Sequence, residues 1–190
     1  MSESVFLCPY CTTTWETFEA FKAHVLGEHE AEPVPTPDGL IALTVNGQAY
    51  EVQVQPEWTL YDLVHEKMGL IGAKMFCDRG ACGSCTVIMD GRPILSCMTL
   101  AIECGGKSVE TVEEVARTRP LLIEKYAEHH AMQCGYCTPG FVVTAKALLD
   151  RNPNPTEDEI KEALAGNLCR CGTYPQHPRA ILEAAEKPGE

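Results

Sequence analysis

The stretch Cys77-Asp-Arg-Gly-Ala-Cys82-Gly-Ser-Cys85 decides how this chain folds, and a fourth cysteine, Cys97, follows it after eleven further residues. The spacing C-x4-C-x2-C with one distant cysteine is typical of a plant-type 2Fe-2S cluster. Gly80 and Gly83 suit such a loop, because glycine admits φ > 0 and lets backbone N–H groups point at an anionic cluster. A four-cysteine zinc site is the alternative, but zinc normally pairs two C-x2-C halves.

Composition limits the classes of protein that the chain can belong to. It has 190 residues, eleven of them cysteines, and a formal net charge of −12. The length allows two or three compact units. No signal stretch, twin-arginine pair or long apolar run is present, which predicts a cytoplasmic protein that is not embedded in a membrane. In that reducing compartment, cysteines at motif spacing are metal ligands before they are disulfides.

A second metal-ligating pattern lies in residues 1–31. Its four candidate ligands have the spacing C-x2-C…H-x4-H, and they are Cys8, Cys11, His24 and His29. Apolar residues occupy the core positions of a small ββα unit, so the segment resembles a C2H2 zinc finger and predicts a tetrahedral zinc site. The alternative is a disordered tail in which the cysteines and histidines occur by chance.

This finger is not expected to read DNA. Two of the three helix positions that normally face bases are alanines, Ala20 and Ala23, and the segment carries five glutamates against one lysine. The acidic charge of the whole chain likewise disfavours nucleic acid and anionic membranes as partners. We therefore expect a docking or structural module. Residues 32–39 contain alternating prolines and predict a stiff linker that separates the finger from the rest of the chain.

Residues 40–110 predict a β-grasp ferredoxin domain, so that the fold class is α+β. The expected elements are strands 40–45, 49–54, 86–89 and 93–97 and a helix over 59–68 that precedes the cluster loop. Asn46-Gly47 between the first two strands is the strongest short-range hairpin signal, and Asp90-Gly91 indicates a second turn. Cys104 lies outside the motifs, and we expect it to be a buried, inert thiol.

Residues 111–190 predict an all-α bundle. Thr111-x-x-Glu114 and Thr156-x-x-Glu159 have the pattern of capping boxes at helix starts. Thr138 and Pro139 are suited to cap and open an apolar helix over 141–149. Its positive N-terminal end would then lie beside the preceding cysteines and stabilise an anionic centre.

Four cysteines of this second domain form another candidate site. They are Cys134 and Cys137, in a C-x2-C pair, and Cys169 and Cys171, in a C-x-C pair. The one-residue gap is unusual for zinc, which remains the alternative, and burial among helices suits a redox cluster.

Three segments together resemble the small iron-sulfur subunits of the xanthine oxidase family of molybdenum hydroxylases. They are the cluster loop with its flanks (72–87), Gln133-Cys-Gly-Tyr-Cys-Thr-Pro-Gly-Phe141 and Gly166-Asn-Leu-Cys-Arg-Cys171. The resemblance runs from about Leu40 to the C-terminus, and the N-terminal finger lies outside it. Ala73, Phe76 and Ser84 stand where this family usually has Thr, Gly and Ala.

The resemblance implies an electron-transfer subunit with no catalytic residues of its own. Electrons from a molybdopterin-binding large subunit would pass singly through the helical-domain 2Fe-2S cluster and then the β-grasp 2Fe-2S cluster, to an FAD-binding subunit or an external acceptor. Gln133 would hydrogen-bond the partner's pterin, unless it is simply a surface glutamine. The alternative function is a stand-alone ferredoxin-like carrier or redox sensor whose finger docks a regulatory partner.

Overall fold

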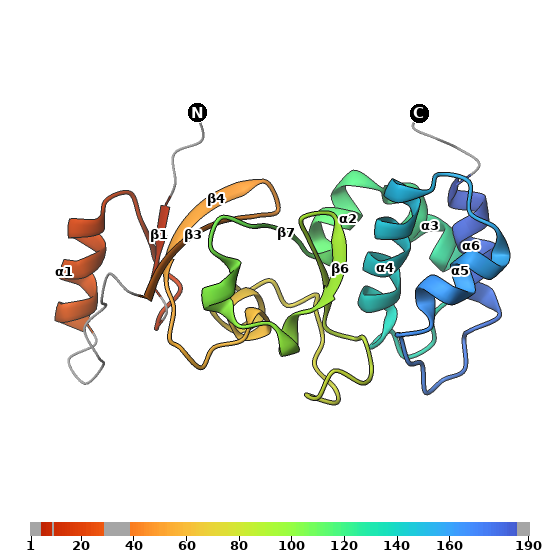
Figure 1. Cartoon of the computed structure of the whole chain (residues 1–190), viewed down its shortest axis with the longest axis horizontal. Coiled ribbons are helices and arrows are strands. Elements are labelled where there is room, and N and C mark those ends of the chain that lie inside the picture. The colour runs from red at the N-terminus through yellow and green to blue at the C-terminus, as the bar shows by residue number, and fades with distance from the viewer. Residues whose placement is uncertain (1–4, 9, 29–38, 186–190) are drawn as a thin grey trace.

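The computed structural model describes residues 5–8, 10–28 and 39–185 of the chain. An N-terminal module, a sheet domain and a helical bundle succeed one another along its long axis (Figure 1). His29 and residues 32–38 of the predicted linker lie outside the described residues. Among the helices of the described ranges, none combines the length and apolarity needed to cross a membrane.

The described strands form one mixed sheet in the order β2-β1-β4-β3-β7-β5-β6. Their bounds are β1 Val5–Leu7, β2 Thr14–Trp15, β3 Leu40–Val45, β4 Gln48–Gln53, β5 Thr86–Met89, β6 Arg92–Leu95 and β7 Ser108–Glu110. Both predicted hairpins are confirmed, because β3 pairs with β4 and β5 with β6 in antiparallel fashion. Asn46 and Gly47 both have φ > 0, at 51° and 81°, as a tight hairpin turn with right-handed twist requires.

The elements around the cluster loop differ in detail from the prediction. The helix expected over 59–68 is present, but its central part, η2 Asp62–Lys67, is π-helical. β6 stops at Leu95, so Cys97 lies in the 3₁₀ turn η3 Ser96–Met98 and not in a strand. A second 3₁₀ turn, η4 Ala101–Cys104, places Cys104 in the core with no exposed surface. Burial raises the pKa of the Cys104 thiol to about 11, which agrees with the predicted inert role.

The C-terminal part is the predicted helical bundle. Its helices are α2 Val112–Thr118, α3 Pro120–Glu128, α4 Thr138–Arg151, α5 Glu157–Leu164 and α6 Gln176–Ala185. All residues of α4 from Gly140 to Leu149 are buried, which makes this helix the centre of the bundle core. The same helix also packs against the sheet domain beside β5 and β6 (Figure 1).

The predicted helix caps have mixed outcomes. The capping box of Thr156 and Glu159 is confirmed. The one predicted at Thr111 is wrong, since the Thr111 hydroxyl hydrogen-bonds the side chains of Asn46 and Glu113. Thr138 does not cap α4 either, because its hydroxyl is buried without a hydrogen-bond partner among the described residues. At Thr111 a partner that is distant in sequence, Asn46, therefore replaces the local cap.

The N-terminal module is joined to the sheet domain. β1 and β2 are antiparallel and α1, Phe18–Glu28, comes after them, which is the ββα order. β1 also pairs in parallel with β4, with Leu7 opposite Val52, and Leu7 is buried in the core of the sheet domain. The expectation that the linker separates the module from the ferredoxin domain is therefore wrong. An unpaired strand edge offers free N–H and C=O groups, and β1 satisfies those of β4.

Candidate metal centres

The β-grasp cysteines lie on the loop between η2 and β5 and on the turn η3. Gly80 and Gly83 of this loop both have φ of 71°, as predicted for a loop that wraps a cluster. The sulfurs of Cys85 and Cys97 are 3.3 Å apart. The Cys82 thiol lies on the same loop and lowers the pKa of the Cys77 thiol.

The loop backbone stabilises a thiolate at Cys77. The Ala81 N–H donates to the Cys77 sulfur at 3.3 Å. Burial acts to raise the pKa of Cys77, but the backbone of Arg79 and the thiol of Cys82 outweigh it, so that the pKa falls to about 7. The pKa of Cys97 rises to about 12 because the thiol is buried and lies against Cys85. Backbone N–H groups directed at sulfur are also what an anionic cluster requires.

Two of the helical-domain cysteines, Cys134 and Cys137, lie just before α4. The other two, Cys169 and Cys171, lie on the loop after α5. Cys137 is the residue that precedes the first turn of α4, so the positive end of that helix lies beside it as predicted. Burial raises the pKa of Cys137 to about 12, and Cys169 and Cys134 add to the effect. Cys134 also acts on the pKa of Cys171.

The sulfurs of both four-cysteine sets are spaced more widely than a single zinc ion requires. Tetrahedral zinc with bonds of about 2.3 Å brings all four sulfurs within about 3.8 Å of one another. Among the described residues, the one group of three or more Cys, His or acidic ligand atoms gathered within 4.8 Å is Cys8, Cys11 and His24. In a 2Fe-2S centre two thiolates bind each of two irons. Neither four-cysteine set forms such a group among the described residues, so the spacing favours a binuclear cluster, and the ligand assignment stays a prediction.

Direct hydrogen bonds join the two cysteine sites. The Leu168 N–H, next to Cys169, donates to the carbonyl oxygen of Cys82 at 2.9 Å. The Asn167 side chain donates to the Gly83 carbonyl at 3.0 Å, and its own oxygen accepts from Thr144. Sequence reasoning missed this bridge, although Asn167 and Leu168 fall within one of the cysteine motifs.

Close backbone packing holds the bridge together. A Cβ atom on Gly140 would lie 2.3 Å from the Gly83 carbonyl oxygen, so a side chain there would push the two domains apart. Beside the bridge, the Tyr136 hydroxyl donates to the Met75 carbonyl at 2.7 Å and ties the loop of Cys134 and Cys137 to the sheet domain.

One side of the helical-domain site is open to solvent. Cys134 and Cys171 are exposed, and so is Gln133. Phe76, which is 77% exposed, stands beside Tyr136 with their ring centroids 6.4 Å apart.

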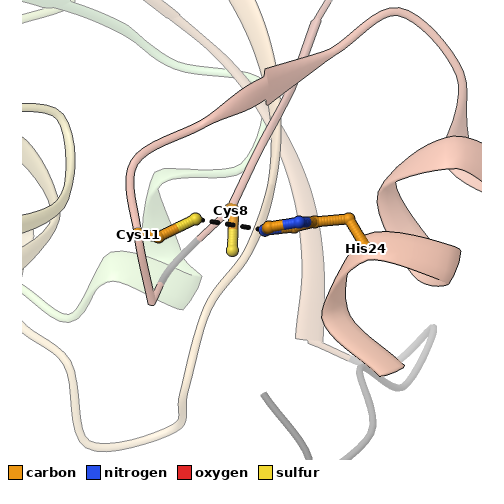
Figure 2. A group of neighbouring side chains, drawn as sticks. All are labelled: Cys8, Cys11 and His24. Atoms are coloured by element: carbon orange, nitrogen blue, oxygen red, sulfur yellow. Dashed lines mark hydrogen bonds between the residues drawn. The ribbon is translucent and has the colours of Figure 1, made fainter. Parts of the chain in front are cut away.

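The N-terminal module brings three of its four predicted zinc ligands together. Figure 2 shows Cys8 and Cys11 from the β1–β2 turn facing His24 on α1, and the ligand atoms lie within 4.8 Å of one another. The Cys11 sulfur is 3.1 Å from His24 Nε2. Phe21 and Val25 are buried and pack with Cys8. The fourth predicted ligand, His29, lies outside the described residues.

Comparison with known proteins places the chain among 2Fe-2S proteins. A model described as a 2Fe-2S iron-sulfur cluster binding domain matches residues 43–103, and one described as a 2Fe-2S binding domain matches residues 111–182. The nicotine 6-hydroxylase small subunit of Paenarthrobacter nicotinovorans is 44% identical over 154 residues, 80% of this chain and 93% of its own length. The nicotinate dehydrogenase small FeS subunit of Eubacterium barkeri is also 44% identical, over 77% of this chain and 95% of its own.

A solved structure agrees with this placement. Quinoline 2-oxidoreductase from Pseudomonas putida 86 contains a chain that is 42% identical, with a TM-score of 0.74, over 77% of this chain and 93% of that chain. Fold and cysteine sites thus define a protein with two 2Fe-2S domains. The chain belongs to the small iron-sulfur, electron-transfer subunits of the xanthine oxidase family of molybdenum hydroxylases.

Proposed function

We propose that this chain relays single electrons from a molybdopterin-binding partner subunit to an FAD-binding subunit or an external acceptor. The ligands of its two 2Fe-2S centres are Cys134, Cys137, Cys169 and Cys171 in the helical domain and Cys77, Cys82, Cys85 and Cys97 in the β-grasp domain. When bound, the clusters supply one-electron redox chemistry. The observation that carries the proposal is the hydrogen bond from the Leu168 N–H to the Cys82 carbonyl, which joins the two ligand-bearing loops.

The exposure of the helical-domain site supports the order of transfer. Cys134, Cys171 and Gln133 lie at the surface, so a partner subunit can approach this site closely, and Gln133 can hydrogen-bond its pterin. The β-grasp site is more enclosed, because Cys82, Cys85 and Cys97 are buried. Phe76 and Tyr136 supply the apolar surface for the same partner.

Iron content and spectroscopy test this proposal. The purified chain should contain about four irons and, when fully reduced, show two EPR species, because the two sites differ in exposure and hydrogen bonding. Cys104→Ala is the control and should retain all the iron, since Cys104 lies outside both sets. Two irons per chain, or a single EPR species on full reduction, would contradict the assignment.

We further infer that residues 1–31 form a zinc finger that serves as a structural module. Three ligand atoms within 4.8 Å and the ββα order support the metal. The pairing of β1 with β4 indicates that the module closes the edge of the β-grasp sheet of its own chain. This intramolecular role replaces the docking to a partner that the sequence suggested. We keep the predicted boundaries of the segments, which are 1–31, 32–39, 40–110 and 111–190.

Substitution of His24 tests the zinc site. His24→Asn should lower the zinc content from about one per chain to near zero and leave iron unchanged, because a module this small depends on its metal to fold. The melting temperature should also fall, since β1 would leave the edge of β4. His130→Asn is the control and should keep its zinc. Equal zinc in the two variants would refute the site.

A further inference from the structure

A buried chain of hydrogen bonds leads away from the sulfur of Cys169. The Thr173 hydroxyl lies 3.2 Å from that sulfur, and Nε2 of His177 lies 3.2 Å from the same hydroxyl. All three side chains are buried, with exposures of 7% for Cys169, 8% for Thr173 and 1% for His177. Neither Thr173 nor His177 belongs to a cysteine motif, and the relay described above does not use them.

The chemistry of the three groups sets the direction of the protons. A thiolate ligand is an acceptor, so the Thr173 hydroxyl must donate to it. The Thr173 oxygen is then free to accept, and the donor within reach is the N–H at Nε2 of His177. His177 Nδ1 is therefore unprotonated, and it has no hydrogen-bond partner among the described residues.

The His177 ring is held in place. It stacks on Phe141 with ring centroids 4.1 Å apart and planes inclined by 8°, and the Tyr126 ring lies 5.4 Å away. Burial lowers the pKa of His177 to about 4, so the imidazole is neutral at physiological pH. The imidazole therefore acts as a fixed N–H donor and not as a charge.

We propose that Thr173 and His177 are positioning residues that raise the reduction potential of the helical-domain 2Fe-2S centre through a hydrogen bond to Cys169. This rests on the proposed ligation of that centre by Cys169. A hydrogen bond to a ligand sulfur stabilises the more negative, reduced form and makes the centre easier to reduce.

The test is an EPR-monitored redox titration of the iron-loaded full chain, which reports both centres in one sample. Thr173→Val removes the hydroxyl at nearly constant size and should make the helical-domain centre at least tenfold harder to reduce relative to the β-grasp centre. That is a relative shift of about 59 mV for a one-electron couple. Thr173→Ser keeps the hydroxyl and should restore the potential. The β-grasp centre is the internal reference.

His177→Phe is the second variant, and it keeps a ring to stack on Phe141 while removing the N–H donor. It should shift the same centre in the same direction but less, because the Thr173 hydroxyl can still donate to the sulfur. If Thr173→Val fails to load iron, the potential of His177→Phe tests the proposal instead. An unchanged potential of the helical-domain centre, or an equal shift of both centres, would overturn the proposal.

The outcome is separable from that of the proposed function. If the unaltered chain lacks a second cluster, the ligand assignment fails and the titration has no helical-domain signal. If both clusters are present and Thr173→Val leaves their potentials unchanged, electron transfer stands and only the role of Thr173 and His177 is refuted.

Discussion

Replacing Cys169 with serine should remove the helical-domain cluster, about half of the iron, and nearly all electron flow from the partner subunit to the acceptor. Cys169 is buried, and its sulfur lies 3.2 Å from the Thr173 hydroxyl. A serine hydroxyl does not ionise at neutral pH and binds iron poorly in comparison. With that site empty, no redox centre lies between the molybdenum subunit and the β-grasp cluster, so electron transfer must cross a longer distance.

The measurement is rapid mixing of substrate with the assembled complex, monitored by the absorbance of the β-grasp cluster. Its reduction by substrate should be slower by orders of magnitude in Cys169→Ser, while dithionite still reduces it. Cys104→Ser is the matched control, because it also places a hydroxyl in a buried thiol position but outside both sites. Substrate-driven reduction as fast as in the unaltered complex would show that the proposed order of transfer is wrong.

Gly140→Ala should destabilise the contact between the two domains by about 3 kcal/mol, the upper part of the usual range for overpacking. The new Cβ atom would lie 2.3 Å from the Gly83 carbonyl and 3.1 Å from the Asn167 amide nitrogen. A backbone carbonyl cannot rotate away as a flexible side chain can, so the loops must separate. The hydrogen bonds from Asn167 and Leu168 would weaken with them.

The expected results are a melting temperature lower by roughly 6–12 °C and slower electron exchange between the clusters. Gly166→Ala is the matched control, since a Cβ atom there meets nothing within 4 Å and the residue lies beside the same bridge. Calorimetry and flash reduction of the complex provide the two readouts. If Gly140→Ala and Gly166→Ala have the same melting temperature and the same rate of electron exchange, the domain contact does not depend on the close approach of Gly140 to Gly83.

Local sequence was sufficient for the elements whose causes are local. Asn46-Gly47 favours φ > 0 at both turn positions whatever surrounds it, and the hairpin is present where it was predicted. Thr156 and Glu159 cap each other across a single turn, so their capping box is also confirmed. The spacing of Cys77, Cys82 and Cys85 likewise predicted a glycine-containing loop, and Gly80 and Gly83 both have φ > 0 there.

Side chains with competing long-range partners were not predictable in this way. Thr111 has the same local pattern as Thr156, yet its hydroxyl bonds Asn46, which is distant in sequence and lies in the β3–β4 turn. β1 was expected to belong to a separate finger, but the free edge of β4 and the burial of Leu7 draw it into the sheet. These outcomes depend on which surfaces meet, and local spacing does not encode that.

The sequence by itself therefore determined which thiols are available as ligands and with which family they are shared. Only the tertiary structure decided which hydrogen bonds connect the two sites. Leu168 bonds Cys82, and Asn167 bonds Gly83. Thr173 and His177 form a hydrogen-bond chain that ends at the sulfur of Cys169. The physical reason is that a hydrogen bond between segments requires both to be positioned to within a few tenths of an ångström, and packing of the whole core sets that position.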